Sequence, residues 1–184
     1  MRLSRLFAPA VVASAPMAAC VSNDLEDFAD APREFRLEDY FLGETTAYGI
    51  FEDRFGKLRR QFTVDITGTL EGDVLTLDER FLYDDGERET RVWVIDVLGD
   101  GKYRGTAGDV IGVAEGEVSG NAFNWTYKIN LKIDEDTTWK VGFDDWMYLQ
   151  PDGVLINRAY VTRFGFEIGS VTITFQKGAR ASTS

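Results

Sequence analysis

Three charged residues in this chain could form one polar site. The 184 residues include 31 acidic and 20 basic side chains but no histidine. His-ligated metals and Ser-His or Cys-His catalytic pairs are therefore excluded. Hairpin turns at Asp84-Asp85-Gly86 and Gly99-Asp100-Gly101 would place Glu79 and Asp109 opposite Arg91. We expect a guanidinium between two carboxylates, because buried charges are rarely left unpaired.

This arrangement allows two interpretations. In the first, the three residues form a structural ion-pair network, which perturbs charged groups without any catalytic role. In the second, Arg91 is the polar anchor of a ligand cavity and binds a ligand carboxylate through two parallel hydrogen bonds. The second interpretation predicts a carrier of acidic, lipid-like molecules.

A second polar group lies on the same apolar face. Asp145 alternates with Phe143 and Met147, whereas Asp144 points to the opposite side of its strand, so the adjacent carboxylates cannot act together as general acid and base. A glycosidase pair would need two carboxyl groups at a defined separation across a cleft. The sequence does not supply that separation, and we predict no catalytic residue, metal or cofactor. The candidate ligand-binding residues are Glu79, Arg91, Trp93, Asp109, Trp125, Tyr127, Asp145, Asn157 and Arg163.

Aromatic side chains at strand spacing are expected either in the core or along an apolar pocket. From Tyr40 onward, apolar and polar residues alternate between Gly-containing turns, which predicts about ten antiparallel strands and requires no helix. A two-residue turn at Glu71-Gly72 would pair Leu70 with Asp73. Further pairings place Leu77 opposite Trp93, and small Gly112, Ala114 and Gly116 opposite or beside Trp125 and Tyr127.

A meander of this length with one apolar face is expected to curl into a closed up-and-down barrel, which leaves no exposed sheet edge. The predicted fold is all-β and lipocalin-like (calycin-type), with an interior that is either filled or holds one small ligand. A two-sheet sandwich is the alternative, since alternation alone does not separate the two.

The N-terminus predicts export. Arg2 and Arg5 precede an apolar run that ends in small residues before Cys20, the chain's one cysteine. This segment resembles the lipobox of bacterial lipoproteins, with Met17 where Leu is usual, and Val21 suggests the outer membrane by analogy with lipoprotein sorting. The expected organisation is a signal peptide over 1–19, a lipidated tether and cap over 20–39, a single barrel over 40–177 and a tail over 178–184.

Several longer stretches resemble a bacterial lipoprotein family known as domain of unknown function 3833. They are Tyr83-Asp84-Asp85-Gly86-Glu87, Arg91-Val92-Trp93, residues 103–112, residues 143–148 and Phe164-Gly165-Phe166. The resemblance implies a lipoprotein and carries no reaction with it. The lipocalin comparison departs from that group's Gly-x-Trp hallmark, because Thr45 occupies the Trp position after Gly43.

The leading hypothesis is a membrane-tethered, non-enzymatic barrel of the cell envelope that binds a small apolar or amphipathic ligand. The alternative is an interaction lipoprotein with a solid core that binds another envelope component. A third hypothesis is a calycin-type isomerase or lipid-processing enzyme. The net charge of −11 argues against nucleic acid and against docking on anionic lipid headgroups.

Overall fold

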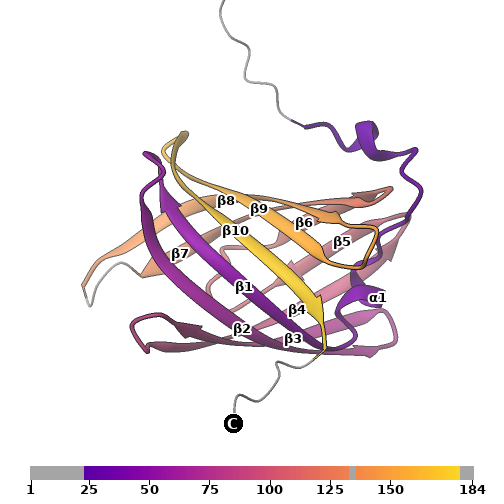
Figure 1. The fold of residues 1–184 in the computed structure, drawn as a ribbon, viewed down its shortest axis with the longest axis horizontal. Helices are drawn as coiled ribbons and strands as arrows, with labels where there is room; N and C mark the ends of the chain where they lie inside the picture. The colour runs from indigo at the N-terminus through magenta and orange to yellow at the C-terminus, as the bar shows by residue number, and fades with distance from the viewer. Residues whose placement is uncertain (1–22, 133–135, 179–184) are drawn as a thin grey trace, which may run out of the picture.

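The computed structural model describes residues 23–132 and 136–178. The predicted signal peptide, Cys20 and all but the first residue of the predicted tail lie outside these ranges. The described chain forms one barrel, with its N-terminal segment running along one side and entering one end (Figure 1).

Ten antiparallel strands close the barrel within the described residues, in the order β1-β10-β9-β8-β7-β6-β5-β4-β3-β2. Every strand pairs with its sequence neighbours, and β1 closes the ring by pairing with β10. The prediction of an all-β, lipocalin-like meander closed into a barrel is therefore confirmed, and the alternative, a two-sheet sandwich, is wrong. The strands are β1 (Gly43–Asp53), β2 (Leu58–Glu71), β3 (Val74–Tyr83), β4 (Arg88–Gly99), β5 (Lys102–Thr106), β6 (Ala114–Ser119), β7 (Ala122–Lys132), β8 (Thr138–Leu149), β9 (Leu155–Arg163) and β10 (Phe166–Lys177).

The predicted strand faces are correct, and one predicted register is wrong. Leu77 pairs with Trp93 as expected. Between β2 and β3, however, Leu70 pairs with Leu75 instead of Asp73, a slip of two residues. Gly72 adopts a φ of +60° at the first position of this turn, which shifts the turn one residue along the chain. A slip of two keeps every side chain on its face.

Large rings inside the barrel pack against small residues, as the sequence suggested. Gly116 pairs with Trp125, and a Cβ atom at Gly116 would collide with the rings of Trp125 and Phe123. Gly112 does not take part, because it lies at a φ of +78° in the connection between β5 and β6. The interior thus gains space for an indole ring from residues that lack a side chain.

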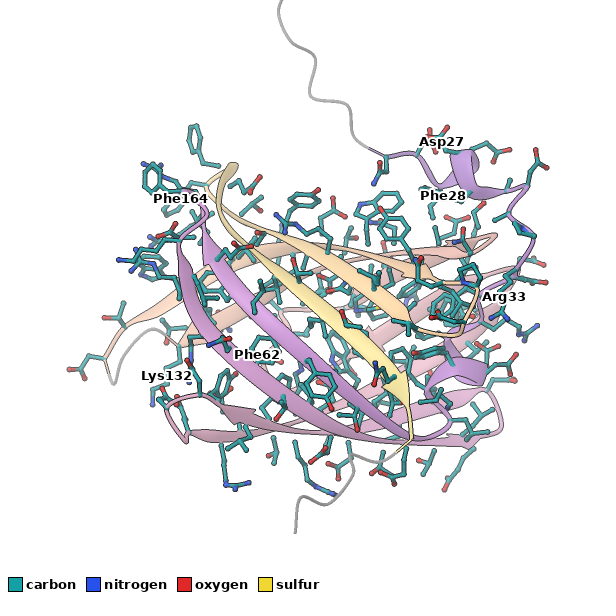
Figure 2. All side chains as sticks on the ribbon, viewed as in Figure 1. Asp27, Phe28, Arg33, Phe62, Lys132 and Phe164 are labelled. Carbon is teal, nitrogen blue, oxygen red and sulfur yellow. The ribbon has the colours of Figure 1, made fainter. Side chains whose placement is uncertain are left out.

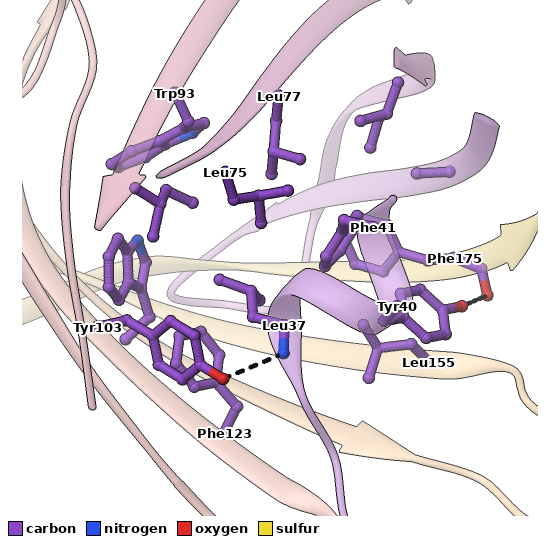
Figure 3. Close-up of a cluster of buried hydrophobic side chains, with 14 of the residues drawn as sticks. Leu37, Tyr40, Phe41, Leu75, Leu77, Trp93, Tyr103, Phe123, Leu155 and Phe175 are labelled. Atoms are coloured by element: carbon purple, nitrogen blue, oxygen red, sulfur yellow. Dashed lines mark hydrogen bonds between the residues drawn. The ribbon is translucent and has the colours of Figure 1, made fainter. Parts of the chain in front are cut away.

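The N-terminal segment, expected to be a tether and a short cap, contains two short helices. A 3₁₀ turn, η1 (Leu25–Phe28), packs outside the barrel, and a short helix, α1 (Leu37–Phe41), enters one end. Four apolar side chains of residues 35–41, here called the plug segment, are buried in the main core: Phe35, Leu37, Tyr40 and Phe41. Figure 3 shows Leu37 beside Tyr103 and Phe123, and Phe41 beside Phe175. Phe35 and Leu37, which were expected to lie in a cap, therefore complete the core together with Tyr40 and Phe41.

The plug makes the two barrel ends different. Around α1, inward side chains such as Leu75, Phe123 and Leu155 are almost completely buried. At the other end, here called the distal end, the strands meet in turns near residues 54–57, 84–87, 107–113 and 164–165. Inward rings there, including Phe62 and Phe143, are only partly buried. The interior is thus more accessible from the distal end than from the plugged end.

Candidate functional site

The predicted guanidinium between two carboxylates is present inside the barrel. Glu79 of β3 pairs directly with Arg91 of β4, and the Arg91 Nε donates to Glu79 Oε2 at 2.8 Å. Asp109, in the connection after β5, places its Oδ2 at 3.7 Å from Arg91 Nη1. The juxtaposition predicted from two hairpin registers is confirmed.

A second polar pair faces this network from β7 and β8. The Tyr127 hydroxyl donates to Asp145 Oδ2 at 2.9 Å, and Asp145 pairs across the strands with Trp125. The Trp93 ring lies edge-on to both neighbouring rings, 5.3 Å from Tyr127 and 5.7 Å from Trp125 between centroids. We call Glu79, Arg91, Asp109, Tyr127 and Asp145 the polar cluster; aromatic rings surround it.

Burial controls the protonation of Asp145. This residue is only 6% exposed, and burial raises its pKa to about 7, with Asp144 and Glu79 adding to the rise. The Tyr127 hydrogen bond and the Arg91 charge act in the opposite direction without cancelling it. The carboxyl therefore titrates near neutral pH, well above the ordinary range for aspartate.

Tyr127 and Arg91 each keep one protonation state. Burial, followed by the Asp145 charge, raises the pKa of Tyr127 well above its ordinary value, so the hydroxyl keeps its proton. Burial lowers the pKa of Arg91, but Glu79, Tyr127 and Asp109 together outweigh it and the net pKa is raised. Arg91 is accordingly a permanent cation and Tyr127 a permanent hydrogen-bond donor.

Two carboxylate oxygens in the cluster lack a partner. Asp109 Oδ1 and Asp145 Oδ1 are both inaccessible, and neither accepts a hydrogen bond from any group in the described part of the chain. Ionised carboxylate oxygens only accept hydrogen bonds, and buried polar atoms without a partner are rare in folded proteins. Asp109 Oδ1 is therefore an unused acceptor, and Asp145 Oδ1 becomes one when this carboxyl, whose pKa is about 7, is ionised.

Two members of the cluster are partly exposed. The side chains of Arg91 and Asp109 are 26% and 35% exposed, whereas Asp145 lies deeper. Toward the distal end, the Tyr127 ring stacks on Phe143 at 5.2 Å between centroids. Apolar rings next to a few buried polar groups are the usual composition of a small-ligand site.

Two predicted members do not join the cluster. Asn157 is buried, but its Nδ2 donates to the Trp146 carbonyl at 3.4 Å, so it supports the neighbouring strand. Arg163 lies at the end of β9 with its guanidinium 3.9 Å from the centre of the Trp139 ring. It forms no ion pair with Glu79, Asp109 or Asp145.

Sequence reasoning missed the polar contact that fastens the plug segment. The Tyr103 hydroxyl donates to Glu38 Oε2 at 2.7 Å, and Arg36 donates to the other oxygen of the same carboxylate at 2.6 Å. The signal was present, because Leu37, Tyr40 and Phe41 have the i, i+3, i+4 spacing of one helix face. Five residues are too few for that spacing to stand out among strands.

The described residues contain no cluster of three or more His, Cys, Asp or Glu side chains suited to a metal ion. None of their helices has the length and apolar character to cross a bilayer.

A shallow groove of about 610 Å³ lies on the barrel wall across β10, β1, β2 and β3. Its lining residues include Tyr48, Ile50, Leu82 and Thr172. It is separate from the polar cluster.

A closed ten-strand meander with a plugged end defines a lipocalin-like barrel. This class is supported by a solved structure, the S-type phycobiliprotein lyase CPES from Guillardia theta, which is similar over 78% of this chain and 91% of that chain. Its TM-score is 0.58 and its sequence identity 10%, so the likeness concerns the fold alone.

The family follows from a second comparison. The family model described as "Protein of unknown function (DUF3833)" matches residues 14–177, and the chain belongs to this family. No curated protein matches the sequence.

Proposed function

We propose that this protein is a non-enzymatic, lipid-anchored envelope protein whose barrel binds a small lipophilic molecule carrying a hydrogen-bond donor. The observation that carries the proposal is the pair of unpartnered carboxylate oxygens on Asp109 and Asp145, inside a barrel and among aromatic rings. The segment ending at Cys20, which resembles a lipobox, supports the anchor and the envelope location.

The charge balance favours a donor over an acid as the ligand's polar group. Arg91 is already neutralised by Glu79 at 2.8 Å and faces Asp109 at 3.7 Å. A ligand carboxylate would have to displace one of these partners and would add a fourth acid beside Asp145. An amine or hydroxyl would instead donate to Asp109 Oδ1 and, with the carboxyl ionised, to Asp145 Oδ1. The acidic ligand expected from sequence is therefore replaced by an amphiphile with an N–H or O–H head.

The aromatic side chains near the polar cluster favour an apolar body for the ligand. Tyr127 hydrogen-bonds to Asp145 and Trp125 pairs with it across the strands. The Trp93 ring contacts both of these rings, and Phe62 and Phe81 are partly buried against the same core. Apolar surface of this kind binds a chain or ring by excluding water. We infer a head that reaches Asp145 and a body that extends toward the distal turns.

The test compares three probes of equal chain length, dodecylamine, dodecanol and dodecanoic acid, each kept below the concentration at which it aggregates or separates from solution. The full chain with Cys20→Ser is titrated while tryptophan fluorescence is recorded, since Trp93 and Trp125 border the site. The amine and the alcohol should bind at least about tenfold more tightly than the acid, a difference equivalent to one retained hydrogen bond to a charged group. Asp145→Asn should weaken the amine, whereas Asp144→Asn, which faces the other side, should not.

Two results would overturn the proposal. If dodecanoic acid binds best and Arg91→Lys weakens it, the barrel is a carrier of acidic ligands. If no probe binds and native mass spectrometry of the cell-derived protein finds it empty, the solid-core interaction protein is the better interpretation.

A further inference from the structure

Two turns at the distal end expose three phenylalanine rings. Phe55 in the β1–β2 turn, Phe164 in the β9–β10 turn and Phe166 at the start of β10 are 80%, 85% and 73% exposed. The next most exposed large apolar side chain in the described residues is Leu98, at 54%. Single exposed apolar residues need no explanation, but a group of rings marks an interaction surface.

The two turns lie side by side. β1 and β10 are paired, and the Arg54 amide donates to the Ile168 carbonyl at 3.1 Å, linking one turn to the neighbouring strand. Both turns reach the same corner of the barrel in Figure 1, and Figure 2 shows Phe164 pointing away from it. We call Phe55, Phe164 and Phe166 with their flanking basic residues the aromatic tips.

The backbone of Phe164 is also unusual. Its φ is +52°, and Gly165 follows at +81°, so the two residues between Arg163 and Phe166 both adopt the left-handed region. Asn, Asp or Gly normally occupies such positions, and a bulky residue there is a strained exception. A side chain that packs on no core yet occupies a strained position indicates a function outside the folded core.

Basic residues surround the rings in a chain that is acidic as a whole. The Arg54 guanidinium lies 4.6 Å from the centre of Phe55, and that of Arg163 lies 4.7 Å from Phe164. Arg54, Arg163 and Lys57 form no ion pair with any described residue. The nearby acids are largely engaged elsewhere, with Asp53 held by Arg59 and Glu52 facing Arg158, while Glu167 remains beside Phe166. The net charge of −11 therefore conceals a local basic and aromatic surface.

We propose that the aromatic tips insert into the interfacial region of an anionic phospholipid membrane. Exposed rings bury apolar area at the boundary between headgroups and acyl chains, while adjacent Arg and Lys attract anionic headgroups. In Figure 2, Phe28 and Phe164 both lie on the upper side of the barrel, at opposite ends of it. Phe28 lies eight positions after Cys20 in the sequence, so the segment that follows the predicted anchor and the tips share one side of the barrel in this view.

The experiment removes the predicted lipidation site and compares variants of the tips in an otherwise identical chain. The full chain with Cys20→Ser is co-sedimented with vesicles of equimolar phosphatidylglycerol and phosphatidylethanolamine, and in parallel with pure phosphatidylcholine vesicles. We expect binding to the anionic vesicles that weakens as salt is added. Each ring removed by Phe55→Ser, Phe164→Asn or Phe166→Ser should lower the affinity roughly tenfold.

The variant Phe164→Asn distinguishes a loss of vesicle binding from a loss of folding stability. Asn tolerates a positive φ, so this variant should be at least as stable as the parent while it binds vesicles less well. Leu98→Ser, at the plugged end, removes an exposed apolar side chain outside the tips and should leave vesicle binding unchanged. Arg54→Ala with Arg163→Ala should reduce both the binding and its salt dependence.

The proposal fails if the Cys20→Ser chain does not bind anionic vesicles, or if it binds them equally well without the three rings. It also fails if the chain is a dimer that Phe164→Asn converts to a monomer while vesicle binding is absent. In that case the tips would be a contact between two copies of the chain.

Discussion

Replacing Asp145 with Asn should stabilise the protein at alkaline pH and have little effect in acid. The carboxyl is 6% exposed, and its pKa is about 7 against an ordinary value of 3.8. The folded state therefore binds this proton more tightly than the unfolded state does. By linkage, the free energy of unfolding falls as the pH rises from about 4 to about 7, and the loss is complete above that range.

The magnitude follows from the difference between the two pKa values. A difference of about three pH units corresponds to about 4 kcal/mol, the cost of holding an ionised carboxylate at this position. Asn is neutral at every pH and its carbonyl oxygen can still accept the Tyr127 hydrogen bond. The variant should match the parent near pH 4 and exceed its stability by up to about 4 kcal/mol near pH 8.

The assay is urea denaturation of the full chain with Cys20→Ser, followed by tryptophan fluorescence at a series of pH values. Asp144→Asn is the matched control, because it removes the adjacent carboxylate on the outer face, where Asn124 donates to it at 2.6 Å. The control should keep the direction of the parent's pH dependence with a slightly smaller amplitude, because the Asp144 charge adds to the rise in the pKa of Asp145. A constant difference between Asp145→Asn and the parent at all pH values would refute the reasoning, as would lower stability of the variant at pH 8.

Three further substitutions test separate contacts by the same denaturation method. Arg91→Ala should lower the free energy of unfolding by about 3 kcal/mol or more, because it leaves Glu79 as an uncompensated buried charge. No change in stability would mean that water screens this ion pair as it does at a protein surface. Tyr103→Phe should cost about 1–3 kcal/mol by removing a donor from buried Glu38, and an unchanged midpoint would mean that the plug segment does not depend on this bond. Gly116→Ala should cost about 1–3 kcal/mol and alter the near-ultraviolet circular dichroism of the tryptophans, and an unchanged spectrum would contradict the close packing beneath the ring.

Much of the barrel was predictable because strand parity is a local property. A side chain's face depends only on whether its position is odd or even, so Glu79, Arg91 and Asp145 could be assigned to the interior before their neighbours were known. The exact pairing is less constrained. Leu70 pairs with Leu75 rather than Asp73, and both alternatives keep the same face inside.

Depth along the barrel axis was not predictable in the same way. Alternation does not distinguish a polar residue near an open end, such as Arg163, from one at mid-barrel, such as Asp145. The plug segment adds to the difficulty, because its contact with Tyr103 joins residues 65 positions apart. The unpartnered oxygens of the polar cluster depend on this three-dimensional arrangement, and no sequence pattern reports them.

The two proposals meet at one end of the molecule. Residues 35–41 fill the end opposite the aromatic tips, so a ligand moving toward Asp145 would enter past the distal turns. If those turns rest in the headgroup region, this entrance lies beside lipid, and an amphiphile could pass between the bilayer and the barrel without crossing bulk water. Removing the tips should then slow uptake of dodecylamine from vesicles while leaving its affinity in solution unchanged, since the tips do not contact the polar cluster. Equal loss of both would instead mean that Phe55, Phe164 or Phe166 forms part of the binding site.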